Sequence, residues 1–255
     1  MKPTVVLLLG KPPKPGTIVD DLRTQLVEAG CAVEVVLPKQ GESTSGTADL
    51  VVHRGLGARA SEWLRPFLDA GVTVCPGTAD SGSRSALWAD LVAGGVRVPG
   101  ARRRATWGEV LAEEPRKVVV KSEQGSGRGQ EVAVSPLPPE PVFEGPYLVE
   151  EYVENDGWDR KLYVAGDGVF GLLKPSPLRS AAGLDGAAVL EVTQDLRTVA
   201  LAAAAATGMH LCGVDVILGE DGPVVVDVNP FPGYRGVPGA GEAVVRHVLG
   251  HLPGL

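Results

Sequence analysis

The sequence contains few aromatic residues, cysteines and histidines, and its hydrophobic runs are short. Aromatic residues make up 5% of the 255 residues, and there are three cysteines and four histidines. No apolar stretch approaches the roughly 18 residues of a membrane-spanning helix. Residues 1–10 are too short for a secretory signal followed by a cleavage site. We therefore expect a cytosolic protein with no membrane partner.

The cysteines and histidines show no spacing typical of a disulfide framework or a structural metal site. The cysteines are Cys31, Cys75 and Cys212, and the histidines are His53, His210, His247 and His251. The cysteines are odd in number, far apart and set in apolar runs, so we interpret them as reduced core thiols. The histidines lack partners at zinc-ligand spacing, so we expect none of them to bind zinc, and the sequence leaves their roles open.

Basic residues are outnumbered by acidic ones. There are 24 Lys and Arg against 31 Asp and Glu, which gives a net charge of −7. This balance argues against a nucleic-acid partner, because sequence-independent binding needs many cationic contacts with phosphates. It also argues against a substrate that carries several phosphates. With 44% hydrophobic residues, the chain can bury a full core in one large domain or in a few compact lobes.

The N-terminal part alternates apolar runs with amphipathic stretches. We predict strands over Thr4–Leu9, Ala32–Leu37, Asp49–His53 and Val72–Cys75, and helices from Thr17 to Ala29 and over Ala60–Ala70. This alternation indicates an open parallel α/β sheet, whose ligands bind beyond the carboxyl ends of the strands. The loop Gly10–Gly16 and Arg54 would lie at that edge, where a guanidinium can fork onto a carboxylate or phosphate. A surface ion pair is an equal alternative for Arg54, and the loop lacks the spacing of a dinucleotide site.

A glycine-rich segment follows a strand that ends on a lysine. The predicted elements here are a helix over Ser83–Ala93, a helix from the capping box Thr106/Glu109 to Glu114, and a strand over Val118–Val120. Lys121 follows this strand and precedes the segment SEQGSGRGQ. Glycines let backbone N–H groups approach phosphate oxygens, and lysine adds a positive charge, so the segment is a candidate phosphate loop. A flexible hairpin tip is the alternative, and the segment is not a Walker A loop.

Two lysines flank a predicted hairpin in the second half of the chain. Lys161 precedes the strands Leu162–Val164 and Val169–Leu173, which pair about a Gly-Asp-Gly turn, and Lys174 follows them. Both lysines could face one anion, and two solvated strand-end lysines are the alternative. The other predicted elements are a strand over Tyr147–Val153, a loop over Ser176–Leu190, and helices over Val192–Thr207 and Gly239–Leu249.

An acidic hairpin lies near the C-terminus. The apolar runs Leu211–Leu218 and Pro223–Val228 are joined by the turn Gly-Glu-Asp-Gly, which is a strong hairpin signal. Each run carries one carboxylate among valines, Asp215 in the first and Asp227 in the second, and Asn229 follows. Carboxylate and amide oxygens suit Mg²⁺ that also contacts nucleotide phosphates. A surface hairpin with solvated acids is the alternative.

The order of these segments resembles that of the ATP-grasp superfamily. The matching stretches are Lys121 with its glycine-rich loop, the segment KLYVAGD that begins at Lys161, and GVDV…VVVDVNPFPGY. The resemblance implies an α/β fold (α+β ATP-grasp) with an N-terminal open parallel α/β pre-domain over residues 1–80. It implies a small lobe with the glycine-rich hairpin over residues 81–147 and a C-terminal lobe with the metal site over residues 148–255. In this family ATP lies between the two lobes with two magnesium ions.

The resemblance also assigns roles to single residues. The metal ligands would be Asp215, Asp227 and Asn229. The catalytic residues would be Lys161, Lys174 and Arg235. The substrate contacts would be Arg54, Arg128 and Arg179. The phosphate contacts of the nucleotide would be Lys121, Gly125, Ser126 and Gly127, together with Arg84 at a position where many members of the family have lysine. Glu151 and Tyr152 would form the adenine hinge. Asp159 would bind the ribose, with Glu154 as the alternative.

Two branches of the superfamily compete. Ribosomal-protein glutamate ligases (RimK-like) share the GVD…VNxxPG layout, and some show a PGWRG ending close to PGYRG here. They usually carry glutamate in place of Asp227 and arginine in place of Lys161. Inositol-trisphosphate kinases are similar at Asp227–Tyr234, at Lys161–Asp167, at Lys174–Ser176 and at Val51–Arg54, and locally this match is the better one. The scarcity of basic residues favours the ligase, because the arginines left outside the ATP site suffice for one or two carboxylates.

We therefore expect an ATP- and magnesium-dependent phosphoryl-transfer enzyme, a carboxylate–amine ligase that forms an acyl phosphate. Its substrate would be a small, anionic, amino-acid-like molecule. A kinase of an inositol-phosphate-like alcohol is one alternative, and a non-catalytic nucleotide-binding module is another. ATP-grasp enzymes are often dimers, so the resemblance leaves a homodimer open, although no predicted helix indicates an interface.

Overall fold

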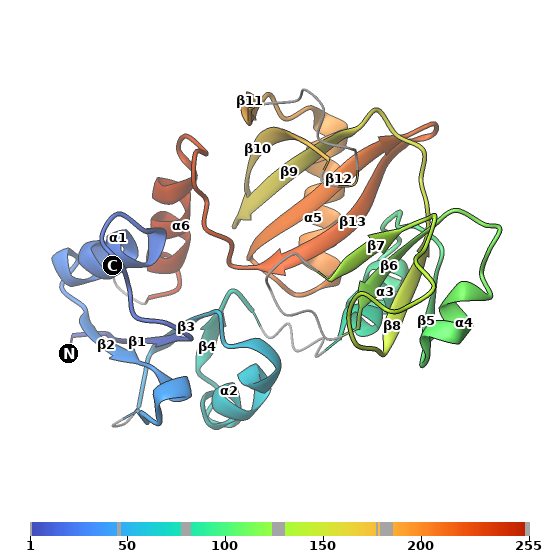
Figure 1. The fold of residues 1–255 in the computed structure, drawn as a ribbon. Helices are drawn as coiled ribbons and strands as arrows, with labels where there is room; N and C mark the ends of the chain where they lie inside the picture. The colour runs from blue at the N-terminus through green and yellow to red at the C-terminus, as the bar shows by residue number, and fades with distance from the viewer. Residues whose placement is uncertain are drawn as a thin grey trace.

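The computed structural model describes residues 2–44, 47–77, 83–123, 131–176, 178 and 186–252. These residues form three β-sheets that follow one another along the chain (Figure 1). No helix within these ranges is long and apolar enough to cross a bilayer. The α/β class is confirmed, whereas the division into units at residues 80 and 147 stays a prediction.

The first sheet contains the N-terminal strands and is parallel throughout. Its elements are β1 Thr4–Leu9, α1 Ile18–Glu28, β2 Ala32–Val36, β3 Leu50–Arg54, α2 Ala60–Asp69 and β4 Thr73–Cys75, with 3-10 turns at Pro38–Gln40 and Gly57–Arg59. The strand order is β2-β1-β3-β4, as expected for an open parallel sheet. Val5 and Leu7 pack in a core with α1, whereas Val6 and Leu8 pack in a core with α2. Burial on both faces explains why β1 is apolar throughout.

The second sheet is antiparallel and small. Its elements are α3 Arg84–Ala93, β5 Ala101–Arg104, α4 Trp107–Leu111, β6 Val118–Ser122, β7 Val132–Val134 and β8 Tyr147–Glu151, with strand order β5-β8-β6-β7. The capping box at Thr106 and Glu109 is confirmed. The predicted end of α4 at Glu114 is wrong, because the helix stops at Leu111 and turns follow up to Pro115. Proline disfavours a helical conformation in the residue before it, which shortens the helix.

The third sheet contains the acidic hairpin. Its elements are β9 Trp158–Ala165, β10 Gly168–Pro175, β11 Ala188–Leu190, α5 Gln194–Ala206, β12 Leu211–Gly219 and β13 Gly222–Pro230. The strand order is β11-β10-β9-β12-β13, and both predicted hairpins are confirmed. The loop predicted over Ser176–Leu190 is wrong at its end, since β11 pairs with Gly171–Leu173 of β10. A strand of three residues is too short to show an alternating pattern in the sequence, so the formation of β11 depends on its pairing with β10.

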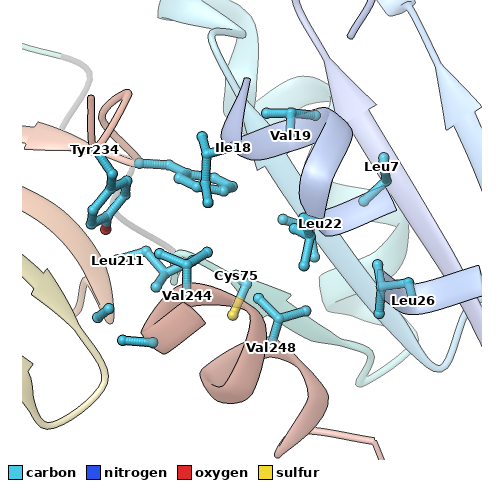
Figure 2. Close-up of a cluster of buried hydrophobic side chains, with 14 of the residues drawn as sticks. Leu7, Ile18, Val19, Leu22, Leu26, Cys75, Leu211, Tyr234, Val244 and Val248 are labelled. Carbon is cyan, nitrogen blue, oxygen red and sulfur yellow. The ribbon is translucent and has the colours of Figure 1, made fainter. Parts of the chain in front are cut away.

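The last helix, α6 Ala240–Leu249, returns to the first sheet and packs beside α1 (Figure 1). Leu22 and Leu26 of α1 share one core with Val244 and Val248 of α6. Figure 2 shows this core, which also includes Tyr234 from the segment after β13. The C-terminal helix therefore joins the third sheet to the first through buried apolar contacts.

Truncation of Leu22 tests this joining core. Leu22 is fully buried, so Leu22→Ala should leave a cavity and lower the free energy of unfolding by about 2–5 kcal/mol. The matched control is Val27→Ala on the same helix, where the side chain is 55% exposed and the change should stay within about 0.5 kcal/mol. Urea unfolding followed by circular dichroism measures both. Equal effects of the two substitutions would contradict the assignment of this core.

Candidate nucleotide and metal site

A row of charged side chains crosses three strands of the third sheet. Lys161 on β9 is paired with Asp215 on β12, and Asp215 is paired with Asp227 on β13. Directly paired residues on antiparallel strands point to the same face. The neighbouring residues on these strands, such as Val214 and Val228, pack in the core with α5 on the other face. The two predicted metal-binding carboxylates therefore share one face, together with a lysine.

The charged row is held by ion pairs. Lys161 Nζ donates to Asp215 Oδ2 at 2.5 Å, and Arg84 Nη1 donates to Asp227 Oδ1 at 3.1 Å. Asn229 Nδ2 donates to Asp227 Oδ2 at 3.0 Å. Arg84 is the first residue of α3, where the helix dipole disfavours a positive charge, so the carboxylate of Asp227 compensates for this position. The structure thus brings the predicted residues Arg84, Lys161, Asp215, Asp227 and Asn229 together.

Burial makes the charges of this row depend on one another. Burial raises the pKa of Asp215, the positive charge of Lys161 opposes this, and the charge of Asp227 raises the pKa further. Burial by itself lowers the pKa of Lys161, but the ion pair and hydrogen bond with Asp215 outweigh it and raise the pKa. Two neighbouring carboxylates in such a place require cationic compensation.

The donor atoms of this site fit a magnesium ion. Asp215 and Asp227 supply carboxylate oxygens, and Asn229 supplies an amide oxygen, which are the ligands that Mg²⁺ accepts. Two further polar atoms close to the start of α3, Arg84 Nε and Glu123 Oε2, are buried without a hydrogen-bond partner among the described residues. Buried polar atoms usually have partners, so these atoms are consistent with a polar ligand at this place.

Lys121 connects the second sheet to the third. Its Nζ forms a buried ion pair with Glu150 Oε2 at 2.7 Å and donates to the carbonyl oxygen of Val226 at 2.6 Å. Val226 is the extra residue of a β-bulge, because Asp215 pairs with Asp227 whereas Val216 pairs with Val225. The bulge leaves a carbonyl outside the strand pairing, next to the candidate metal ligand. The predicted phosphate-binding lysine is therefore placed beside Asp227.

Glu150 is a residue of the site that the sequence analysis did not single out. It lies on β8 and is 5% exposed. Its carboxylate compensates the positive charge of Lys121 on the neighbouring strand β6. Burial raises its pKa, with Lys121 opposing the shift. The available signal was a glutamate inside the apolar run YLVEEYV, beside a strand that carries a lysine in an equally apolar setting.

The predicted adenine hinge lies at the end of β8. The amide N–H of Glu151 donates to the carbonyl of Gly100 at 2.8 Å, and that of Tyr152 donates to the carbonyl of Lys117 at 3.0 Å. Lys117 Nζ also lies 3.5 Å from the centre of the Tyr152 ring and donates to Glu154 at 2.8 Å. Both hinge amides are thus engaged within the protein, and the adenine role of these two residues stays a prediction.

Asp159 and Lys174 lie on the same face as the charged row. They are cross-strand partners on β9 and β10, and Asp159 is two residues before Lys161. Asp159 Oδ2 is 4.0 Å from Lys161 Nζ. Burial raises the pKa of Asp159, while the charge of Lys161 opposes the shift. The two predicted catalytic lysines therefore share a face, with Asp159 between them.

Arg54 and Arg235 come together although they are distant in sequence. Arg54 Nε donates to the carbonyl oxygen of Phe231 at 2.9 Å, and its guanidinium carbon lies 5.8 Å from the centre of the Phe231 ring. Burial lowers the pKa of Arg54, and the positive charge of Arg235 lowers it further. Within the described part of the chain, neither guanidinium forms an ion pair with a carboxylate. Two neighbouring, uncompensated arginines favour binding of an anion.

The segment that carries Arg235 has an unusual backbone. Phe231 has φ of 37° and Tyr234 has φ of 51°, which is the left-handed region that bulky residues rarely adopt. Such a conformation costs on the order of 1–3 kcal/mol per residue. Both side chains are buried, and Tyr234 Oη donates to the carbonyl of Val164 at 2.7 Å. Packing therefore holds the strained segment that places Arg235 near Arg54.

Several predicted site residues lie outside the described residues. They are Gly125, Ser126, Gly127 and Arg128 of the glycine-rich loop, and Arg179. Their predicted roles in binding phosphate and substrate stay predictions.

The expectation that no histidine binds zinc stays a prediction, although the structure groups two of the histidines with a cysteine. The ligand atoms of Cys75, His247 and His251 all lie within 4.8 Å of one another. Spacing in the sequence does not show this group, because Cys75 is brought to the two histidines by the packing of α6 against the first sheet. The three cysteines are buried and free, as expected for reduced core thiols.

Removal of Lys121 tests the buried pair. In Lys121→Met the carboxylate of Glu150 loses its compensating charge, so its pKa in the folded protein should rise further above the reference value of 4.5. A raised carboxyl pKa in the folded state destabilises the fold as pH increases past the pKa of the unfolded state. We expect a loss of about 3–5 kcal/mol at pH 8 and a smaller loss at pH 5.

Urea unfolding at the two pH values measures this effect. The double substitution Lys121→Met with Glu150→Met should recover part of the loss, because no unpaired charge then remains buried. Lys117→Met is the matched control, since Lys117 pairs with an exposed glutamate and its loss should change the free energy of unfolding little at either pH. A loss in Lys121→Met that is the same at both pH values would contradict the explanation.

Comparison with known proteins identifies related sequences and folds. Residues 140–242 match the model of the RimK-like ATP-grasp domain. Over 99 residues, the chain is 37% identical to a probable alpha-L-glutamate ligase 2 of Shewanella sp. (strain MR-4). The aligned segment covers 36% of this chain and 33% of that protein. The matching segment therefore spans about a third of the length of such curated relatives.

Solved structures match over almost the whole chain. The RimK domain protein ATP-grasp from Sphaerobacter thermophilus DSM 20745 superposes with a TM-score of 0.68 and 22% identity, over 96% of this chain and 99% of that one. The ATP-grasp ligase PsnB complexed with minimal precursor, Mg and ADP superposes with a TM-score of 0.67 and 17% identity, over 97% of this chain and 96% of that one. At these identities the likeness establishes the fold alone. The chain therefore has the fold of these ATP-grasp proteins, and its residues 140–242 are similar to the RimK-like ATP-grasp domain.

Proposed function

We propose that the chain is an ATP- and magnesium-dependent carboxylate–amine ligase that activates a small, amino-acid-like carboxylate as an acyl phosphate. The observation that carries this proposal is the pair Arg54 and Arg235, whose side chains both lie beside Gly233 and form no ion pair with a carboxylate among the described residues. Their two positive charges suffice for a substrate with one or two carboxylates. The alpha-L-glutamate ligase name of the curated relatives supports the same class.

The charged row would bind the phosphate end of ATP. Asp215, Asp227 and Asn229 would hold magnesium, which when bound supplies positive charge to phosphate oxygens. Arg84 and Lys161 already contact these two carboxylates, so they lie next to any phosphate held there. Lys121 lies at the bulge beside Asp227 and adds a further positive charge. The PsnB complex with Mg and ADP supports this combination of ligands in the fold. The binding of two magnesium ions is part of the proposal.

The chain would act by placing the reactants and neutralising charge. A carboxylate oxygen of the substrate attacks the γ-phosphorus, the bond to the ADP oxygen breaks, and an acyl phosphate forms. The nitrogen of an amine then attacks the acyl carbon, the bond to phosphate breaks, and the nitrogen loses a proton. Arg54 and Arg235 would orient the carboxylate, while Lys161 and Lys174 would offset the charge on the transferred phosphoryl group. Phosphoryl transfer needs positioning and charge stabilisation and no nucleophile from the protein.

Phosphorus NMR tests the reaction class. The chain is incubated with magnesium-ATP and pools of amino acids, dipeptides or inositol phosphates. A ligase should release ADP and free phosphate only when a carboxylate and an amine are both present. A phosphate ester on an alcohol without free phosphate would identify a kinase and contradict the proposal. Absence of turnover with every pool, together with retained nucleotide binding, would favour a binding module.

Substitution of the arginine pair tests the carboxylate assignment. A charge-assisted hydrogen bond contributes about 1.5–3 kcal/mol, so Arg235→Gln should raise KM for the carboxylate by roughly ten- to hundredfold. Arg54→Gln should act in the same direction. KM for ATP should change by less than about twofold in both, because neither arginine forms an ion pair with the carboxylates of the charged row among the described residues.

Steady-state kinetics with each substrate varied in turn measures these constants. Arg65→Gln is the matched control, because Arg65 is exposed on α2 and should leave both constants unchanged. A change in KM for ATP without a change in KM for the carboxylate would assign the arginine pair to the nucleotide and refute its role with substrate.

A further inference from the structure

We propose that Cys75, His247 and His251 form a second metal site, separate from the magnesium ligands, which takes a divalent transition-metal ion of the zinc type. Thiolate and imidazole are the ligands that such ions prefer over carboxylate and amide oxygens. The three ligand atoms lie within 4.8 Å of one another. The inference does not depend on the reaction proposed above.

The distance between the two histidine nitrogens fits tetrahedral coordination. His247 Nε2 and His251 Nε2 are 3.2 Å apart. In a tetrahedral zinc site with Zn–N bonds of about 2.0–2.1 Å, two ligating nitrogens lie about 3.3 Å apart. His247 and His251 are four residues apart at the end of α6, so their rings meet on one side. A hydrogen bond between the two rings is the competing explanation of the same distance.

The backbone around the cluster fixes the orientation of His247. A Cβ atom on Gly166 would lie only 2.6 Å from His247 Nδ1, so the glycine leaves room for this side of the ring. The opposite nitrogen, Nε2, then faces His251. Nε2 is therefore the nitrogen of His247 that could bind an ion shared with His251.

His210 completes the surroundings of the cluster. Its ring centre lies 5.6 Å from that of His247 and 5.7 Å from that of His251. Its backbone N–H donates to the carbonyl of Pro76 at 2.6 Å, and its carbonyl accepts from Gly166 at 2.9 Å. His210 is therefore tethered next to Cys75, and it or a water molecule would supply the fourth ligand.

Metal binding requires neutral imidazoles and a thiolate. A bound ion would therefore displace the proton of the Cys75 thiol and form a metal–thiolate bond in its place.

The site would join three parts of the fold. Cys75 is the last residue of β4 in the first sheet. His247 lies in α6, and His251 lies two residues beyond the end of this helix. His210 directly precedes β12, the strand that carries Asp215. Cys75 also lies in the apolar core shared by α1 and α6 (Figure 2). A bound ion would therefore act as a structural cross-link between the first sheet and the C-terminal helix.

Cobalt spectroscopy on the full chain, free of metal and of any histidine tag, tests the site. Co²⁺ coordinated by a thiolate gives a sulfur-to-metal charge-transfer absorption, which the oxygen ligands of the magnesium site cannot produce. We expect this absorption to saturate at one equivalent of Co²⁺ and to be displaced by Zn²⁺. Cys75→Ser should abolish it, and His251→Ala should weaken Co²⁺ binding at least about tenfold.

Cys31→Ser is the matched control, because this cysteine is also buried but lies outside the cluster, and its absorption should equal that of the wild type. Zn²⁺ should also raise the melting temperature of the wild type and of Cys31→Ser, but not that of Cys75→Ser. Circular dichroism verifies that each variant is folded. An absent thiolate band in the wild type, or a band that persists in Cys75→Ser, would refute the site and leave the ring-to-ring hydrogen bond as the explanation.

Discussion

The position of the candidate site depends on the alternation of side chains along β9, β12 and β13. On one face of these strands, valine and leucine side chains pack against α5. On the other face, Lys161, Asp215 and Asp227 stand in register across three strands. A shift of one residue in any of these pairings would turn a charged side chain into the apolar core. The burial of the apolar face therefore fixes the register, and the register aligns the charges.

The β-bulge at Val226 links this row to the neighbouring sheet. An extra residue on β13 frees a carbonyl oxygen, and Lys121 from β6 donates to it while paired with Glu150. Arg84 at the start of α3 makes a second link through Asp227. The first contact joins the second sheet to the third, and the second joins α3, which packs against α5, to the carboxylates. The site is consequently formed between two sheets, and neither sheet contains it alone.

Much of this arrangement could be predicted from local patterns. The two hairpins, the capping box at Thr106 and the parallel N-terminal sheet follow from turn chemistry and from apolar periodicity. Asp215 and Asp227 stood out because a carboxylate within a valine run needs compensation. These features depend on residues close in sequence, which is why the sequence alone indicates them.

The remaining features depend on contacts between distant segments. The cluster of Cys75 with His247 and His251 exists because α6 packs against the first sheet, and no spacing in the sequence encodes that contact. The partnership of Lys121 with Glu150 and the proximity of Arg54 to Arg235 arise in the same way. The short strand β11 has too few residues for a pattern and forms only beside β10.

The most direct test of this account is a crystal structure of the chain with magnesium and ADP. The account predicts an ion coordinated by oxygens of Asp215, Asp227 and Asn229, with the phosphates of ADP beside Lys121 and Arg84. An ion bound elsewhere, or phosphates that contact none of these residues, would contradict the central claim that the charged row of the third sheet is the nucleotide and metal site.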